Sequence, residues 1–291
     1  MGARSADVDV LRLAAFTDGG RGGNPAGVVL DAEGMGAARM QAIAAEVGYS
    51  ETAFVRARPI ASGDRLEYDV RYFTPTAEVP FCGHATIAAG VALARRDGPA
   101  PLLFHAAAGA VPVDTRRDAR GDLMATLTSV APWSDELADA DLADVLDALG
   151  WGRGELDPRL PPRLAYAGAR HIVLAAATRK RLAALDYDSG ALSAVMDRLD
   201  AITVALLWRE DFTLLHARNP APAVGIAEDP ATGSAAAAVG HYLVALGELT
   251  PPATLVIRQG ADMGRPSRLD VELDPDRRGV RVSGAASDLP A

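Results

Sequence analysis

The sequence predicts an α+β fold made of two similar lobes, because strand patterns and alanine-rich helices recur in the same order in both halves. A turn at Gly83 opens an alanine-rich helix in the first half, and a turn at Gly233 opens another in the second. The strand patterns at 52–55 and 202–205 keep the same offset of about 150 residues. A period this long does not indicate a solenoid, so we interpret it as a duplicated domain.

In the first half, alternating apolar residues predict strands, and apolar residues spaced three to four apart predict helices. The predicted strands are 8–16, 26–30, 52–56, 66–73, 102–105, 110–114 and 123–127, and the predicted helices are 36–47 and 86–95. The glycine-rich stretch 18–23 lacks the pattern of a phosphate-binding loop and leads straight into a strand, so we interpret it as a hairpin loop.

In the second half, the same patterns predict a matching set of elements. The predicted strands are 171–175, 202–207, 212–217, 254–258, 268–272 and 279–282, and the predicted helices are 191–199 and 235–246. The acidic, proline-containing stretch 129–162 is interpreted as a linker, with a helix over 135–149. The predicted lobes are therefore 1–128 and 129–291, with the last strand able to return to the N-terminal lobe.

Composition excludes several classes of function. With 29 basic and 38 acidic residues the net charge is −9, which disfavours nucleic acid as a partner. The one lysine, Lys180, lies between two arginines and is a poor candidate for Schiff-base chemistry. One cysteine allows no internal disulfide and no cysteine-rich metal site. No membrane-spanning stretch and no signal peptide is recognised in the sequence, so we expect a cytoplasmic protein.

The two helix starts are candidate anion sites. The first N–H groups of a helix have no intrahelical partner and lie at the positive end of the helix dipole, which suits a small carboxylate. Gly83 with His84, and Gly233 with Ser234, stand at these starts. The alternative is ordinary helix capping. His84 can equally be a packed histidine, and Asp229 can simply initiate the turn before Pro230.

Glu51 and Cys82 are the remaining candidates for chemistry. Glu51 stands at the mouth of an apolar strand, where a carboxylate partly withdrawn from water suits general acid/base catalysis, although a glutamate there can also be simply exposed. Cys82 can be a reactive thiolate at a helix start or an inert packed thiol. A two-base thiol racemase needs a second cysteine, which the chain lacks. No ligand spacing indicates a metal site.

Several motifs resemble the phenazine-biosynthesis isomerase (PhzF-like) family and follow one another in that family's order. They are GNPAG at 23–27, YSETAFV at 49–55, YFTP at 72–75, PFCGHAT at 80–86, EDPATGSA at 228–235 and QGADMGRPS at 259–267. The resemblance implies two pseudo-symmetric lobes of the diaminopimelate epimerase type. Each would be a curved, mostly antiparallel sheet wrapped around a central helix, with the active site between the lobes. It also implies a homodimer that needs neither metal nor organic cofactor.

The resemblance also implies roles for individual residues. Glu51 matches the family glutamate that moves a proton on the substrate, and His84 and Asp229 match polar residues that orient the substrate and assist. The residues that match the substrate-binding side are Asn24, Gly83, Gly233 and Ser234, with Asn24 in a supporting role. Two departures bear on the substrate: Arg218 is not followed by the family's aromatic residue, and the 18–23 loop is enriched in glycine.

Together these observations predict a cofactor-independent isomerase that transfers a proton on a small carboxylate-bearing metabolite. Two alternatives stay open. One is an enzyme of the amino-acid racemase or epimerase kind, which the single Cys82 disfavours. The other is a non-catalytic small-molecule-binding protein that kept the cleft and lost its reaction.

Overall fold

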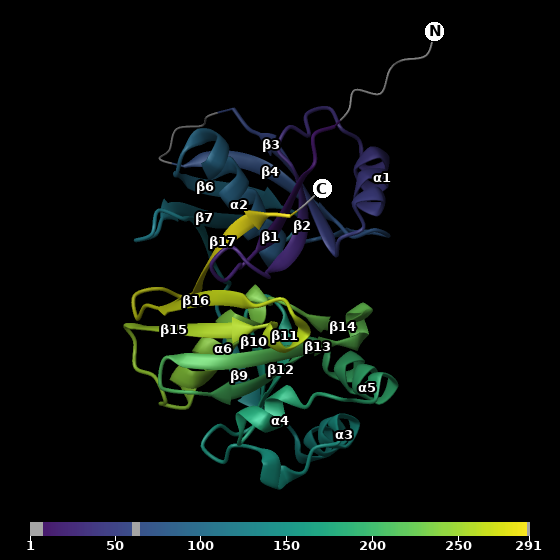
Figure 1. The fold of residues 1–291 in the computed structure, drawn as a ribbon, viewed down its shortest axis with the longest axis vertical. Coiled ribbons are helices and arrows are strands. Elements are labelled where there is room, and N and C mark those ends of the chain that lie inside the picture. The colour runs from purple at the N-terminus through teal and green to yellow at the C-terminus, as the bar shows by residue number, and fades with distance from the viewer. Residues whose placement is uncertain (1–7, 60–64, 290–291) are drawn as a thin grey trace. The chain divides into compact units, whose positions relative to one another are not determined.

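The computed structural model describes residues 8–59 and 65–289, and these divide into two compact units (Figure 1). The first unit takes residues up to Ala15, Pro25–Leu127 and the residues from Ala285 onward. The second takes Phe16–Asn24 and Thr128–Gly284. Residues 1–7, whose sequence argued against a signal peptide, lie outside the described residues.

The first unit is a curved, mixed sheet with one helix inside it and one outside. Its elements are β1 (Leu11–Ala15), β2 (Asn24–Val29), α1 (Ala37–Val47), β3 (Glu51–Ala57), β4 (Leu66–Phe73), β5 (Glu78–Val79), α2 (Gly83–Asp97), β6 (Pro101–Ala106), β7 (Gly109–Arg117) and β8 (Leu123–Thr128). Strand β3 runs parallel to β2 and antiparallel to β4, and β4 is followed in the sheet by β6, β7 and β8. The end of β17 pairs with β1.

Helix α2 is the central helix of the first unit, and Figure 1 draws it among the strands. Its residues from His84 to Ala94 are all buried, and it contacts β1, β3 and β7. Alanine-rich composition makes this possible because small side chains let strands approach closely. At Gly90 the helix lies so close to its strands that an added Cβ would be 3.0 Å from the Cβ of Ala125. Tight packing of this kind fixes the start of the helix relative to β3.

The second unit repeats this plan and adds an outer layer of helices on one face of its sheet. Its elements are β9 (Trp133–Glu136), α3 (Asp139–Leu149), η1 (Arg153–Glu155), β10 (Arg163–Tyr166), β11 (Arg170–Ala175), α4 (Arg179–Ala183), α5 (Ser189–Leu199), β12 (Ala201–Arg209), β13 (Leu214–Ala221), η2 (Pro222–Val224), β14 (Ile226–Asp229), α6 (Gly233–Ala245), β15 (Ala253–Gln259), η3 (Ala261–Met263), β16 (Ser267–Leu273) and β17 (Arg281–Asp288). The central helix is α6, which contacts β9, β10, β11 and β16.

Strand pairing confirms that the fold is duplicated. In the first unit the pairs β2–β3 and β4–β6 are parallel, and β3–β4, β6–β7 and β7–β8 are antiparallel. In the second unit β11–β12 and β13–β15 are parallel, and β12–β13, β15–β16 and β16–β17 are antiparallel. The central helices also pack alike: an added Cβ at Gly240 of α6 would lie 2.9 Å from Val271, and one at Gly90 of α2 would lie 3.0 Å from Ala125.

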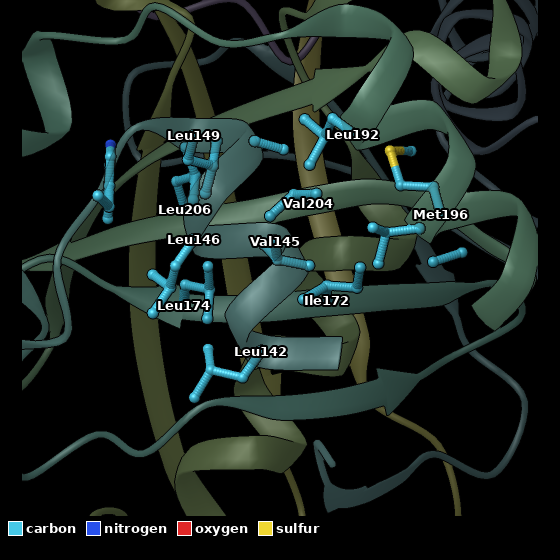
Figure 2. Close-up of a cluster of buried hydrophobic side chains, with 14 of the residues drawn as sticks. Leu142, Val145, Leu146, Leu149, Ile172, Leu174, Leu192, Met196, Val204 and Leu206 are labelled. Carbon is cyan, nitrogen blue, oxygen red and sulfur yellow. The ribbon is translucent and has the colours of Figure 1, made fainter. Parts of the chain in front are cut away.

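The outer layer of the second unit decides which side chains of β11 and β12 face inward. Ile172, Leu174, Val204 and Leu206 pack against α3 and α5 in one hydrophobic cluster (Figure 2). Because side chains alternate along a strand, the residues between them face the other side of the sheet, toward α6. The inward positions include His171, which reaches Ser234 of α6.

The predicted fold class is confirmed, and several individual elements differ from prediction. Residues 135 and 136 belong to strand β9, so the predicted helix over 135–149 begins only at Asp139. Strand β9 pairs with β10, where Trp133 stacks on Tyr166 with ring centroids 5.5 Å apart. The stretch 129–162 is therefore part of the second unit's sheet and outer layer rather than a linker. Strands β10 and β14 were not predicted.

The glycine-rich stretch 18–23 forms the predicted turn. Asp18 and Arg21 exchange backbone hydrogen bonds of 3.0 and 3.2 Å. The turn belongs to the second unit, and the backbone N–H of Gly23 donates to the carbonyl of Pro266 over 3.2 Å. Among the described helices, none is both long and apolar enough to cross a membrane.

Candidate active site

In the first unit, helix α2 begins at Gly83, directly after Cys82 at the N-cap. No side chain caps this end, so its first N–H groups have no side-chain acceptor among the described residues. Packing does not require a glycine here, because an added Cβ at Gly83 would come no closer than 3.9 Å to another residue. The start of α2 therefore has space on the protein side and no side-chain cap, and its use by a small anionic group stays a prediction.

Glu51 is the first residue of β3 and faces the start of α2. Phe54 of the same strand packs in the hydrophobic cluster under α1. Because side chains alternate along a strand, Glu51 faces the opposite side of the sheet from Phe54. The Glu51 side chain is 21% exposed, but its Oε2 atom is buried and makes no hydrogen bond within the described residues. His84 Nε2 lies 3.3 Å from that oxygen. This is close contact without the alignment of a hydrogen bond.

His84 is held between three neighbours. Its side chain is 9% exposed, and Nε2 lies 3.3 Å from Ser50 Oγ as well as from Glu51 Oε2. On the other side of the ring, Nδ1 lies 3.4 Å from Cys82 Sγ. An imidazole placed this way can orient a neighbouring carboxylate and exchange a proton with it. The structure therefore brings Glu51 and His84 together, with Cys82 beside them.

The same three side chains have the donor types of a metal site. Glu51, Cys82 and His84 each offer one ligand atom, and these atoms lie within 4.8 Å of one another. A carboxylate, an imidazole and a thiolate are ligands that zinc accepts. The absence of a metal from the reaction therefore stays a prediction, which a chelator can test.

In the second unit, helix α6 begins at Gly233, and Asp229 braces the turn before it. Asp229 Oδ1 accepts a 2.7 Å hydrogen bond from Asn24 Nδ2, and its Oδ2 accepts one of 2.5 Å from the Thr232 hydroxyl. Gln259 Nε2 donates to the Asp229 carbonyl over 2.7 Å. Asn24 and Asp229 were both predicted, but Gln259 appeared in the sequence only as part of a motif. The turn is rigid because its polar groups are paired inside the unit.

Ser234, the second residue of α6, has a partner that sequence reasoning missed. Its Oγ lies 3.0 Å from His171 Nε2, and His171 Nδ1 lies 2.8 Å from Thr203 Oγ1. His171 is fully buried, and burial lowers its pKa to about 3. The available signal was a polar residue at an inward position of each of two apolar strands, paired in register at His171 and Thr203.

Arg218, which precedes the position where the family's aromatic residue is missing, is paired inside the second unit. The Arg218 guanidinium pairs with the Glu228 carboxylate at 2.6 Å, and both side chains are about nine-tenths buried. Arg218 also donates a 2.8 Å hydrogen bond to the carbonyl of Ala183. The hydrogen bonds to Glu228 raise the pKa of Arg218 above its ordinary value. The Glu228 carboxylate therefore neutralises the charge of Arg218 inside the unit.

Comparisons with known sequences show which family the chain belongs to. The profile of the phenazine biosynthesis-like protein family (PhzC-PhzF) matches residues 13–289. An uncharacterized isomerase of Clostridium acetobutylicum is 31% identical over 96% of this chain and 95% of its own length. The trans-2,3-dihydro-3-hydroxyanthranilate isomerase of Pseudomonas chlororaphis is 32% identical over 87% of this chain and 86% of its own.

Solved structures give the same result. A PhzF-family phenazine biosynthesis protein of Bacillus anthracis matches with a TM-score of 0.85 and 26% identity, covering 97% of this chain and 96% of that one. A probable proline racemase of Agrobacterium radiobacter matches with a TM-score of 0.63 over 96% and 90% of the chains, and at 13% identity it shows the shared fold alone. The chain therefore belongs to the phenazine biosynthesis-like protein family and is an isomerase.

Proposed function

We propose that the chain catalyses a cofactor-independent isomerisation by moving a proton on a small metabolite that bears a carboxylate, with Glu51 as the general acid/base. The observation that carries this proposal is the buried Glu51 Oε2, which has no hydrogen bond within the described residues and lies 3.3 Å from His84 Nε2. A carboxylate oxygen in this state is ready to accept a proton from carbon. The relative that acts on trans-2,3-dihydro-3-hydroxyanthranilate, a cyclic carboxylic acid, supports the class of substrate.

The proposed reaction keeps atoms and electrons balanced within one substrate. The Glu51 carboxylate takes a proton from a ring carbon, and the electron pair of that C–H bond moves into the neighbouring π system. The Glu51 carboxyl then returns the proton to another carbon at the far end of that system. General acid/base catalysis of this kind contributes about 10²–10⁴-fold in rate, or roughly 3–5 kcal/mol of barrier.

We assign His84 to orienting Glu51 and assisting the proton transfer. The imidazole lies within 3.3 Å of both Glu51 Oε2 and Ser50 Oγ, so its ring can follow a change in the charge of the carboxyl. The open N–H groups at Gly83 would bind negative charge on the substrate. Orientation and stabilisation of enolate-like charge would supply the rest of the rate enhancement.

We assign the second unit to substrate binding. Gly233 and Ser234 offer backbone N–H groups at the start of α6, and Ser234 adds a hydroxyl. Asp229 is braced by Asn24 and Thr232, which places its carboxylate beside that helix start. We propose that Asp229 assists proton transfer or orients the substrate, and that Asn24 supports it.

The test is deuterium uptake in D₂O, followed by mass spectrometry, on a panel that contains trans-2,3-dihydro-3-hydroxyanthranilate, other cyclic carboxylic acids and amino acids. We expect uptake or rearrangement with the wild type and none with Glu51→Gln. Glu46→Gln is the matched control, because Glu46 is an exposed carboxylate on α1. Wild-type turnover in Glu51→Gln would overturn the role of Glu51.

The panel also separates the alternatives. Exchange confined to the α-carbon of an amino acid would identify a racemase or epimerase instead. Binding detected by thermal shift without any exchange would favour a non-catalytic binding protein. Activity that survives a chelator would agree with a reaction that needs no metal, whereas loss that added zinc restores would place a metal at Glu51, Cys82 and His84. The homodimer and the cytoplasmic location stay predictions.

A further inference from the structure

His171 forms a buried relay that ends at the start of α6. The ring stands between two hydroxyls, with Nδ1 2.8 Å from Thr203 Oγ1 and Nε2 3.0 Å from Ser234 Oγ. His171 is fully buried and Thr203 is 2% exposed, while Ser234 is only half-buried. Burial alone lowers the pKa of His171 to about 3, so the ring is neutral near neutral pH. The relay therefore joins a closed interior to an open helix end.

A neutral imidazole has one N–H donor and one acceptor nitrogen. One of the two hydroxyls must therefore accept a hydrogen bond from the ring, and the other must donate one to it. If Nδ1 carried the proton, it would donate to Thr203 Oγ1, and the Thr203 O–H would need another acceptor. Within the described residues the Thr203 hydroxyl has no second hydrogen-bond partner. A buried hydroxyl proton left without an acceptor costs about 1–3 kcal/mol. The Thr203 O–H therefore donates to Nδ1.

The rest of the relay follows from that choice. With Nδ1 as the acceptor, the proton is on Nε2, and Nε2–H donates to Ser234 Oγ. The Ser234 O–H is then not needed by His171 and is available to an outside acceptor, beside the N–H groups that open α6. Among the described residues, this arrangement alone satisfies both nitrogens of His171 and the hydroxyl proton of Thr203.

We propose that Thr203 and His171 hold Ser234 as a hydrogen-bond donor to an anionic ligand, with His171 fixed as the Nε2–H tautomer. That the ligand is a carboxylate rests on the proposed function; the tautomer does not. His171 is a positioning residue, since it acts through Ser234. The inference also excludes a serine nucleophile, because a serine is activated by a histidine nitrogen that accepts its proton. Here Nε2 is a donor.

The first test measures the tautomer in the free protein, by ¹⁵N NMR of the histidine rings. The chain has five histidines, and the His171 signals are those missing from His171→Gln. We expect a protonated Nε2 and an unprotonated Nδ1 that do not titrate between about pH 5 and 8. Thr203→Val should shift the Nδ1 resonance toward that of a free lone pair, whereas Thr203→Ser should leave it in place. A protonated Nδ1 would overturn the proposal.

The second test asks what Ser234 does. Incubation with phenylmethylsulfonyl fluoride should leave Ser234 unmodified by mass spectrometry, and a sulfonylated Ser234 would overturn the proposal. With a turned-over substrate, His171→Leu should raise KM about tenfold with kcat nearly unchanged. His171→Gln should recover most of that loss, because an amide can donate to Ser234 and accept from Thr203. A lower kcat with unchanged KM in His171→Leu would contradict a binding role.

The two proposals fail in different ways. If no acid on the panel exchanges deuterium, the proposed function fails, while the tautomer of His171 is still measured on the free protein. If exchange occurs but the ring carries its proton on Nδ1, the relay fails and the role of Glu51 stands.

Discussion

The starts of α2 and α6 stand at the same place in the repeat and carry different chemistry. His84 follows the first residue of α2, and Ser234 follows the first residue of α6. Glu51 begins β3, while the matching strand β12 begins with Ala201. In the first unit the Glu51 carboxyl and the His84 imidazole are in contact. In the second unit the Ser234 hydroxyl contacts His171, which is buried and neutral.

Under the proposed function, this difference divides the steps of the reaction between the two copies of the fold. Both units keep the open helix start, because it follows from the backbone and from small residues. In the first unit the Glu51 carboxyl lies near the helix start, and its buried Oε2 has no hydrogen bond within the described residues, which suits the proposed proton transfer. At the start of α6 the Ser234 hydroxyl and the backbone N–H groups are fixed dipoles, which bind charge without titrating, and the Asp229 carboxylate beside them is held by Asn24 and Thr232. The predictions below test that division.

The largest contrast should appear in the kinetics of Glu51→Gln and Ser234→Ala. Glu51→Gln removes the proton-transfer group, so we expect kcat to fall about 10²–10⁴-fold with KM little changed. Ser234→Ala removes one hydrogen bond to a charged ligand made in both ground and transition states, so KM should rise about tenfold at constant kcat. Steady-state kinetics measures both. Equal effects on kcat in the two variants would end the proposed division.

The second prediction transfers the carboxylate to the other unit. Ala201 is 3% exposed, so Ala201→Glu places a charge in the interior with no partner arranged for it. We expect a loss of about 3–5 kcal/mol in the free energy of unfolding at neutral pH. Ala201→Gln, of the same size, separates crowding from charge. The gap between the two variants in denaturant unfolding should narrow at low pH, where the glutamate is protonated.

A third prediction concerns the pH dependence of stability from His171. Its pKa falls from 6.5 in the unfolded chain to about 3 in the folded one. Between these values the unfolded state binds a proton that the folded state does not, so stability falls as pH drops from about 6.5. His171→Gln lacks this effect, and the difference between variant and wild type should change by about 1.4 kcal/mol per pH unit. Parallel pH profiles would contradict a buried neutral ring.

The smallest expected effects come from glycine-to-alanine variants, which distinguish glycines needed for packing from a glycine needed for ligand binding. Gly90→Ala and Gly240→Ala should each lower the stability by about 1–3 kcal/mol, because the new Cβ lies 3.0 Å or less from a neighbouring strand. Gly83→Ala has room on the protein side and should leave the stability almost unchanged while raising KM. Thermal unfolding and kinetics on the three variants decide this. A loss of stability in Gly83→Ala would assign that glycine to packing.

The sequence by itself determined the repeat, most of the elements and the place of each candidate residue along the chain. Period-two and helical spacing gave the strands around Glu51 and the alanine-rich helices after Gly83 and Gly233, because these patterns depend on neighbours a few residues apart. The motif EDPATGSA at 228–235, with its counterparts earlier in the chain, gave the family. Local chemistry also explains why both helix starts were predicted as anion sites.

The tertiary structure alone decided which side chains meet. Asn24 bonds to Asp229 across 205 positions of sequence, and His171 reaches Ser234 across 63. Residues 135 and 136, predicted as the start of a helix, belong to strand β9, which pairs with β10 and stacks Trp133 on Tyr166. Such partners follow from strand register and from how a sheet closes around its helix. No pattern within a single segment contains that information, because the energy that selects the partners comes from residues far away in sequence.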